Sequence, residues 1–138
     1  VNNITKKITT FGVGEWSPVS EEVNDLDVDY IYCDNEEDLL NKFLAWWAND
    51  YPDIITGWNS QLFDIPYLVS RIERLFGNES KNGLSPFNMT RRRSVTINNQ
   101  EMTTYDIKGI ASLDYIDLYR KFTYNQPESY KLDHIAEI

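Results

Sequence analysis

A single carboxylate stands where an apolar run passes through a loop into a helical pattern. The stretch DIITGWNSQLFDIPY runs from Asp53 to Tyr67, and Asp64 lies where the helical pattern begins. Hard divalent cations take oxygen ligands, so Asp64 at this junction could hold a metal ion over a phosphodiester while Asn59 fixes the loop. The same position suits a helix N-cap, for which aspartate is strongly preferred. Residue types alone favour the cap for Asp64 and a turn role for Asn59.

Hydrolysis of a phosphodiester with two divalent cations requires several carboxylates from different elements. Asp114 and Asp117 lie near the end of the last expected strand, and Asp106 precedes it, so all three are candidates on spacing. Capping of a short helix is the alternative role for Asp114 and Asp117. No Asp-x-Glu pair falls on an expected central strand, so a complete metal site is not visible in the sequence.

Other kinds of catalysis have less support. His134 falls late on an expected helix without a nucleophile motif nearby, which favours a structural histidine. Cys33 follows two apolar residues and is expected to be a buried thiol; a single cysteine fits a reducing compartment. The six glycines form neither a P-loop nor a dinucleotide-binding pattern.

Length and composition predict one globular domain or part of one. The chain has 138 residues, 41% of them hydrophobic and 14% aromatic, which is more than a disordered chain carries. It contains no apolar run of membrane length and no signal-peptide pattern. It begins at Val1 rather than at methionine, so we expect a soluble segment taken from a longer protein.

The net charge of −9 argues against a nucleic-acid partner, but the charge is unevenly distributed. Residues 1–50 hold three basic and eleven acidic residues, whereas residues 51–138 hold ten and eleven. Arg91, Arg92 and Arg93 form the one basic run, and a solvated hairpin tip is the favoured explanation over a contact with a DNA backbone.

Residue patterns predict strands alternating with helices. A helix capped by Asp34 or Asn35 is expected to end near Asn49. Helical spacing favours packing of its Trp46-Trp47 pair in the core over a role as a base-stacking platform. An acidic loop is expected after Ser17-Pro18, a polar linker at 81–88, and a hairpin turn at Asn98-Asn99. Expected strands cover 4–13, 28–33, 53–58, 93–97, 101–107 and 109–115, and further helices cover 65–76, 117–122 and 129–138.

The residues Asn59, Phe63 and Asp64 match Asn-x-x-x-Phe-Asp, which resembles the second exonuclease motif of family B DNA polymerases. The stretch from Ser112 to Ile138 is similar to the segment between the second and third motifs in polymerases of T-even-type phages. The resemblance covers about 28–138 and implies an α/β, ribonuclease-H-like mixed sheet flanked by helices. The sheet would be incomplete at both ends, with its first strand and last helix missing and a β-hairpin inserted at about 88–108.

By this resemblance, residues 1–138 are part of a proofreading 3′–5′ exonuclease domain of a phage-type replicative polymerase. Asp64 would be a catalytic metal ligand for Mg²⁺ or Mn²⁺, Asn59 would support the loop and bind substrate, and Phe63 would pack beside the primer terminus or the core. The implied partners are the single-stranded 3′ end of DNA and the rest of the polymerase chain. The implied location is the host cytoplasm.

Two further motifs of the family are expected outside this chain, an Asp-x-Glu before Val1 and a Tyr-x-x-x-Asp beyond Ile138. We therefore expect the segment alone to be inactive. The alternative is a non-catalytic binding or structural module of a split polymerase, whose open sheet edge needs a partner chain. A free-standing exonuclease would need all its carboxylates in one chain.

Overall fold

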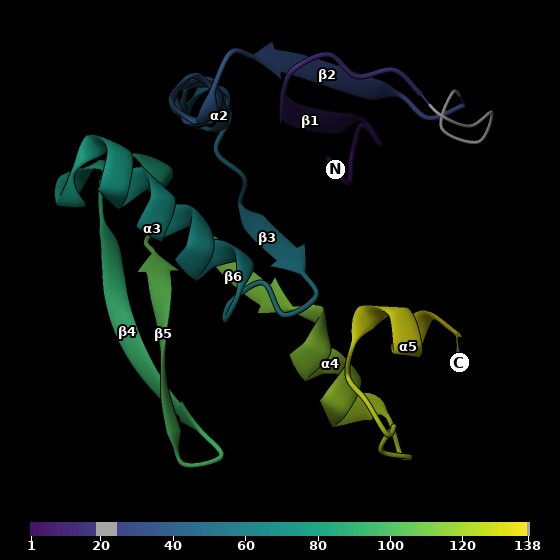
Figure 1. Ribbon diagram of the computed structural model, residues 1–138. Coiled ribbons are helices and arrows are strands. Elements are labelled where there is room, and N and C mark those ends of the chain that lie inside the picture. Colours follow the sequence, from purple (N-terminus) through teal and green to yellow (C-terminus); the bar gives the residue numbers. More distant parts are fainter. Residues whose placement is uncertain (19–24, 138) are drawn as a thin grey trace. The chain divides into compact units, whose positions relative to one another are not determined.

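The computed structural model describes residues 1–18 and 25–137, which fall into two compact units, Val1–Asn49 and Asp50–Ile138 (Figure 1). The acidic loop expected after Pro18 and the terminal Ile138 fall outside the described residues. The elements are β1 (Ile8–Val13), β2 (Val28–Cys33), α2 (Glu36–Asn49), β3 (Ile54–Gly57), α3 (Asp64–Phe76), a 3₁₀ helix η1 (Asn78–Leu84), β4 (Thr90–Ile97), β5 (Gln100–Ile107), β6 (Ala111–Asp114), α4 (Tyr115–Phe122) and α5 (Leu132–Glu137).

The first unit is a parallel strand pair packed against one helix. In the pair β1–β2, Ile8 lies opposite Val28, and α2 contacts both strands. The helix starts at a side-chain cap, since Asp38 N–H donates to Asn35 Oδ1 at 2.9 Å, and Asp38 Oδ2 accepts from the N–H of Asp34, just before the cap, at 2.9 Å. Such a cap satisfies backbone donors that the first helical turn leaves open, and it identifies Asn35 as the capping residue.

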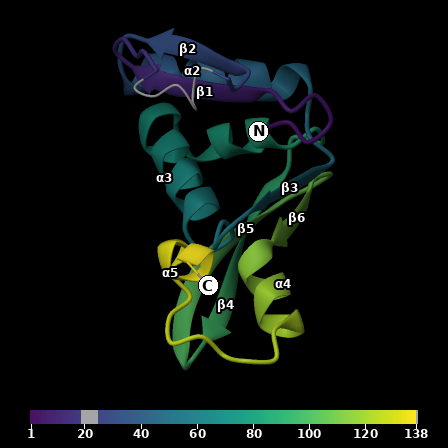
Figure 2. The same cartoon turned by 90° about the vertical axis from the view of Figure 1, so that its right-hand side faces the viewer.

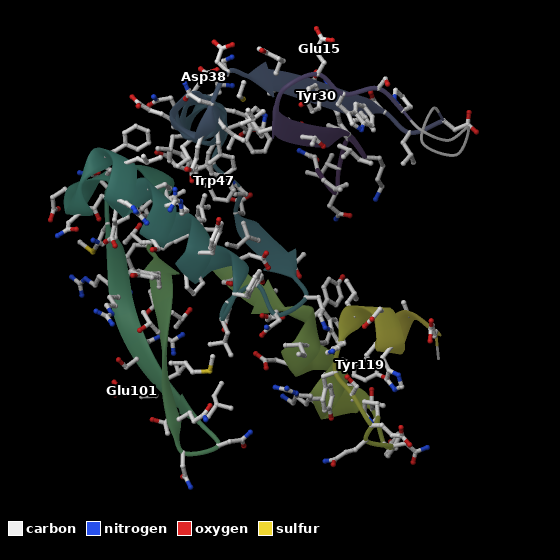
Figure 3. All side chains as sticks on the ribbon, in the orientation of Figure 1. Glu15, Tyr30, Asp38, Trp47, Glu101 and Tyr119 are labelled. Carbon is white, nitrogen blue, oxygen red and sulfur yellow. The ribbon has the colours of Figure 1, made fainter. Side chains whose placement is uncertain are left out.

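Aromatic rings fill the space between β1 and α2. The Phe11 ring lies 5.6 Å from Phe43 and 5.5 Å from Trp46, and Trp47 lies 5.5 Å from Phe43 (Trp47 is labelled in Figure 3). Cys33 at the end of β2 is fully buried, as expected. Trp47 therefore packs within the unit, as predicted, whereas Trp46 contacts Phe11 but is 45% exposed, so the prediction that the pair serves the core holds only in part.

The second unit contains another parallel pair and an antiparallel hairpin (Figure 2). Strands β3 and β6 are parallel, with Gly57 opposite Asp114, so both carboxyl ends meet at one edge. Strands β4 and β5 pair around Asn98 and Asn99, whose φ angles of 50° and 60° are left-handed and confirm the hairpin turn. Helix α3 contacts β5 and η1.

The expected α/β class is confirmed. Within the described residues the strands form three separate pairs, β1–β2, β3–β6 and β4–β5. No helix in this part of the chain is both long enough and apolar enough to span a membrane.

Three local expectations were wrong. The first half of the linker expected at 81–88 belongs to the 3₁₀ helix η1, which tertiary contacts such as Tyr51 Oη to the Gly83 carbonyl (3.0 Å) hold in place. The arginine run 91–93 lies in β4, at the other end of the hairpin from the turn. Helix α5 begins at Leu132 because Trp58 Nε1 donates to the Tyr130 carbonyl at 2.9 Å, which keeps the preceding residues out of the helix.

Candidate active site

The loop between β3 and α3 turns at Asn59. Its φ of 61° is left-handed, a conformation that asparagine tolerates better than most residues. Its N–H donates to Asp114 Oδ1 at 2.8 Å, and its carbonyl accepts from Phe63 N–H at 3.1 Å. The turn role expected for Asn59 is confirmed, and its backbone links the end of β6 to the start of α3.

Asp64 does not cap its helix, so that expectation was wrong. The cap position belongs to Phe63, Asp64 is the first helical residue, and the start of α3 has no side-chain cap. The Ser60 carbonyl instead accepts from Ile65 N–H at 2.9 Å. A backbone carbonyl thus satisfies one of the donors for which the carboxylate was expected.

Two side chains of the motif face solvent. Asp64 is exposed and accepts no hydrogen bond from any described residue. Phe63 is 66% exposed, so it does not pack in the core of this unit, and that alternative was wrong. Tyr67, one helical turn further along, is 63% exposed. An acidic and aromatic surface therefore forms at the start of α3.

Asp114 is the carboxylate that the fold buries. It is 7% exposed and accepts N–H donors from Asn59 (2.8 Å), Gln61 (3.1 Å) and Ile116 (3.1 Å). The contact with Ile116 confirms the predicted cap of α4. The two contacts with the loop were missed, although loops that follow neighbouring parallel strands meet at one sheet edge.

The loop is also tied at Gln61. Its carbonyl accepts from Thr104 Oγ1 at 2.7 Å, and its side-chain amide donates to the Ser112 carbonyl at 3.1 Å. Thr104 lies in β5 and is 2% exposed. Neither Gln61 nor Thr104 was singled out from the sequence, because residues of these types carry no catalytic pattern.

The remaining candidates do not join Asp64. Asp106 forms an ion pair with Arg93 at 3.2 Å. Asp117 is exposed in the first turn of α4, and His134 is partly exposed in α5. Within residues 1–18 and 25–137, no three His, Cys, Asp or Glu side chains are grouped so as to hold a metal ion. Asp64 is thus an available ligand, but these residues alone do not fit a complete metal site.

Two hollows lie near the loop. One of about 190 Å³ is lined in part by Asn59, Arg93 and Arg120, and one of about 440 Å³ is lined in part by Gln61 and Tyr105. Neither hollow is lined by Asp64 or Phe63.

Comparison of the sequence with known proteins identifies the family of this chain. Residues 4–135 match the model of the exonuclease domain of DNA polymerase family B. The chain is 42% identical over 108 residues to the DNA-directed DNA polymerase of Escherichia phage RB69, covering 78% of this chain and 12% of that protein. It is 34% identical over 119 residues to the DNA-directed DNA polymerase of Enterobacteria phage T4, covering 86% and 13%. A shorter match, 39% over 57 residues, is to DNA polymerase II of Escherichia coli, covering 41% and 7%.

The chain belongs to the exonuclease domain family of the family B DNA polymerases. It spans about an eighth of the two phage polymerases that it matches over most of its own length.

Proposed function

We propose that this chain is part of the proofreading domain of a phage-type replicative DNA polymerase, and that the full-length protein removes nucleotides from the 3′ end of DNA. Its site of action is then the host cytoplasm. The proposal is supported by the family match and by the two phage polymerases to which the chain is similar. Residues 1–138 then form a partial exonuclease domain, and the hairpin insertion at about 88–108 corresponds to the antiparallel pair β4–β5.

The observation that carries the proposal is the free carboxylate of Asp64 on the first residue of α3. It follows a loop that leaves the carboxyl end of a parallel strand pair. In the full-length protein Asp64 is one ligand of a Mg²⁺ or Mn²⁺ site, which supplies Lewis-acid activation when occupied. The other ligands lie outside the described residues.

Asn59 and Phe63 have supporting roles in this proposal. The left-handed turn at Asn59 directs the loop toward α3, and the exposed Phe63 ring offers a stacking surface for a terminal base. Both residues contact a single-stranded 3′ end in the proposed complex.

The test measures 3′ trimming of labelled single-stranded DNA by the full-length protein in Mg²⁺ or Mn²⁺. We expect Asp64→Asn to reduce the turnover rate by more than about 100-fold, because loss of a ligand costs at least as much as loss of a residue that orients one. Chelation with EDTA is expected to stop trimming by the wild-type protein. The matched control is Asp53→Asn, an exposed aspartate at the opposite end of β3.

The outcomes separate the alternatives. A wild-type protein that binds DNA but does not trim it in either metal supports the non-catalytic module and refutes this proposal. Trimming by Asp64→Asn at the wild-type rate refutes the role assigned to Asp64.

A further inference from the structure

We infer that Asp114 is a positioning residue for Asp64, acting through the loop that joins β3 to α3. This inference rests on the proposed function. Asp114 ends β6 opposite Gly57, the last residue of β3, so its carboxylate lies at the edge from which the loop leaves.

The two carboxylate oxygens of Asp114 accept hydrogen bonds from different donors. Oδ1 accepts from Asn59 N–H at 2.8 Å and from Ile116 N–H at 3.1 Å, whereas Oδ2 accepts from Gln61 N–H at 3.1 Å. Capping of α4 needs one oxygen. The second oxygen is directed to a loop 53 residues earlier in the chain, which a cap does not require.

The loop passes this restraint on to the residues on either side of Asp64. The Asn59 carbonyl accepts from Phe63 N–H at 3.1 Å, and the Ser60 carbonyl accepts from Ile65 N–H at 2.9 Å. The backbone on both sides of Asp64 is therefore hydrogen-bonded to the segment that Asp114 holds. The Asp64 carboxylate has no hydrogen-bond partner among the described residues. Its position is therefore set by this backbone.

Burial makes the arrangement stiff. Asp114 is 7% exposed, and loss of one partner from a buried carboxylate leaves an unsatisfied polar group. The loop is clamped from its other side by Thr104, whose hydroxyl donates to the Gln61 carbonyl at 2.7 Å. Movement of Gln61 thus costs hydrogen bonds on two sides.

The test compares Asp114→Asn, Asp114→Ser and Asp53→Asn in the full-length protein. Asparagine keeps Oδ1 for Asn59 and Ile116 but presents N–H groups to the Gln61 N–H. Serine keeps a helix cap, but it has no second oxygen for the loop. Asp53→Asn makes the same chemical change at the other end of the sheet, on an exposed side chain.

We expect both Asp114 variants to trim DNA with a turnover rate reduced by about tenfold or more, a larger factor than any rise in the KM for single-stranded DNA. Misplacement of a reacting group lowers turnover, and a shift of the Phe63 backbone, which the Asn59 carbonyl also holds, raises the KM by a smaller factor because the exposed ring remains accessible to substrate. Hydrogen exchange of the peptide covering residues 58–65 is expected to be faster in both variants and unchanged in Asp53→Asn.

The inference fails if Asp114→Ser trims DNA and exchanges hydrogen like the wild type, because Asp114 is then only a cap. It also fails if both Asp114 variants lose the native far-UV circular dichroism, because Asp114 is then a folding residue. If the wild-type protein itself does not trim DNA, the proposed function has failed, and the exchange measurement alone decides whether Asp114 orders the loop.

Discussion

Two carboxylates of the second unit have opposite surroundings. Asp114 is buried and accepts three backbone N–H groups, whereas Asp64 is exposed and accepts none from the described residues. A carboxylate that already accepts several hydrogen bonds has few lone pairs left for a cation, while an unoccupied one keeps them all. The structure therefore separates a carboxylate that holds the loop from one that remains available to a ligand.

Phe63 provides the first prediction at this scale. Base–aromatic stacking contributes about 1–3 kcal/mol per base, so Phe63→Ala should raise the KM for single-stranded DNA by roughly 5- to 150-fold in the full-length protein. The control is Phe87→Ala, which removes another aromatic ring of the same unit that is 72% exposed. An unchanged KM in Phe63→Ala would show that the ring does not contact substrate.

Single residues also show where sequence reasoning stops. Residue type and local pattern were sufficient to predict the turn at Asn59 and the burial of Cys33, because both depend on near neighbours. The prediction that Asp64 caps its helix was wrong, because the Ser60 carbonyl accepts the hydrogen bond from Ile65 N–H at the start of the helix. The loop contacts of Asp114 depend on strand register, which one sequence does not reveal.

At the scale of elements, the start of α2 is predicted to be sensitive to acid. The pKa of Asp38 lies below its ordinary value because Asp34 N–H donates to the carboxylate and Lys42 Nζ pairs with it at 3.0 Å. A lowered folded-state pKa means that the stabilisation is complete above the unfolded-state pKa, about 3.9, and is lost as the pH falls through the folded value.

Titration of the Asp38 carboxyl carbon by NMR checks this prediction. In Lys42→Met the midpoint should rise only part of the way, since the Asp34 contact is the larger cause and remains. An unchanged midpoint would show that Lys42 has no influence on Asp38.

The turn of the hairpin gives another prediction. Asn99 has a φ of 60°, and the left-handed conformation costs a residue with an ordinary side chain about 1–2 kcal/mol. We expect Asn99→Ala to lower the protection of β4 and β5 amides from hydrogen exchange and Asn99→Gly to preserve it. Equal protection in the two variants would contradict the left-handed turn.

Elements with strong local patterns were predicted well, and those fixed by distant contacts were not. Strand β2 was predicted with its observed bounds, because branched and aromatic residues fill it. The 3₁₀ helix η1 has no apolar period and is held by Tyr51 from another part of the unit. Figure 3 shows Tyr119 beside the segment before α5, where its ring lies 6.4 Å from that of Tyr130; this packing helps to explain the late start of α5.

At the scale of the whole molecule, residues 1–138 alone are predicted to trim DNA at least about 100-fold more slowly than the full-length protein in the same Mn²⁺ buffer. Hard cations take about six or more oxygen ligands. Among the described residues, Asp64 is not grouped with two further carboxylates that could complete such a site. Fast trimming by the isolated chain that disappears in Asp64→Asn would contradict this prediction.

The bond from Asn59 N–H to Asp114 also sets an order of events during synthesis. The donor and acceptor are 55 residues apart, so the loop lacks its acceptor until that much more chain has been made. At about 5–20 residues per second, the delay is roughly 3–11 s. During this interval the loop that leads to Phe63 and Asp64 lacks its anchor on β6, so the motif acquires its final shape only after β6 has emerged from the ribosome.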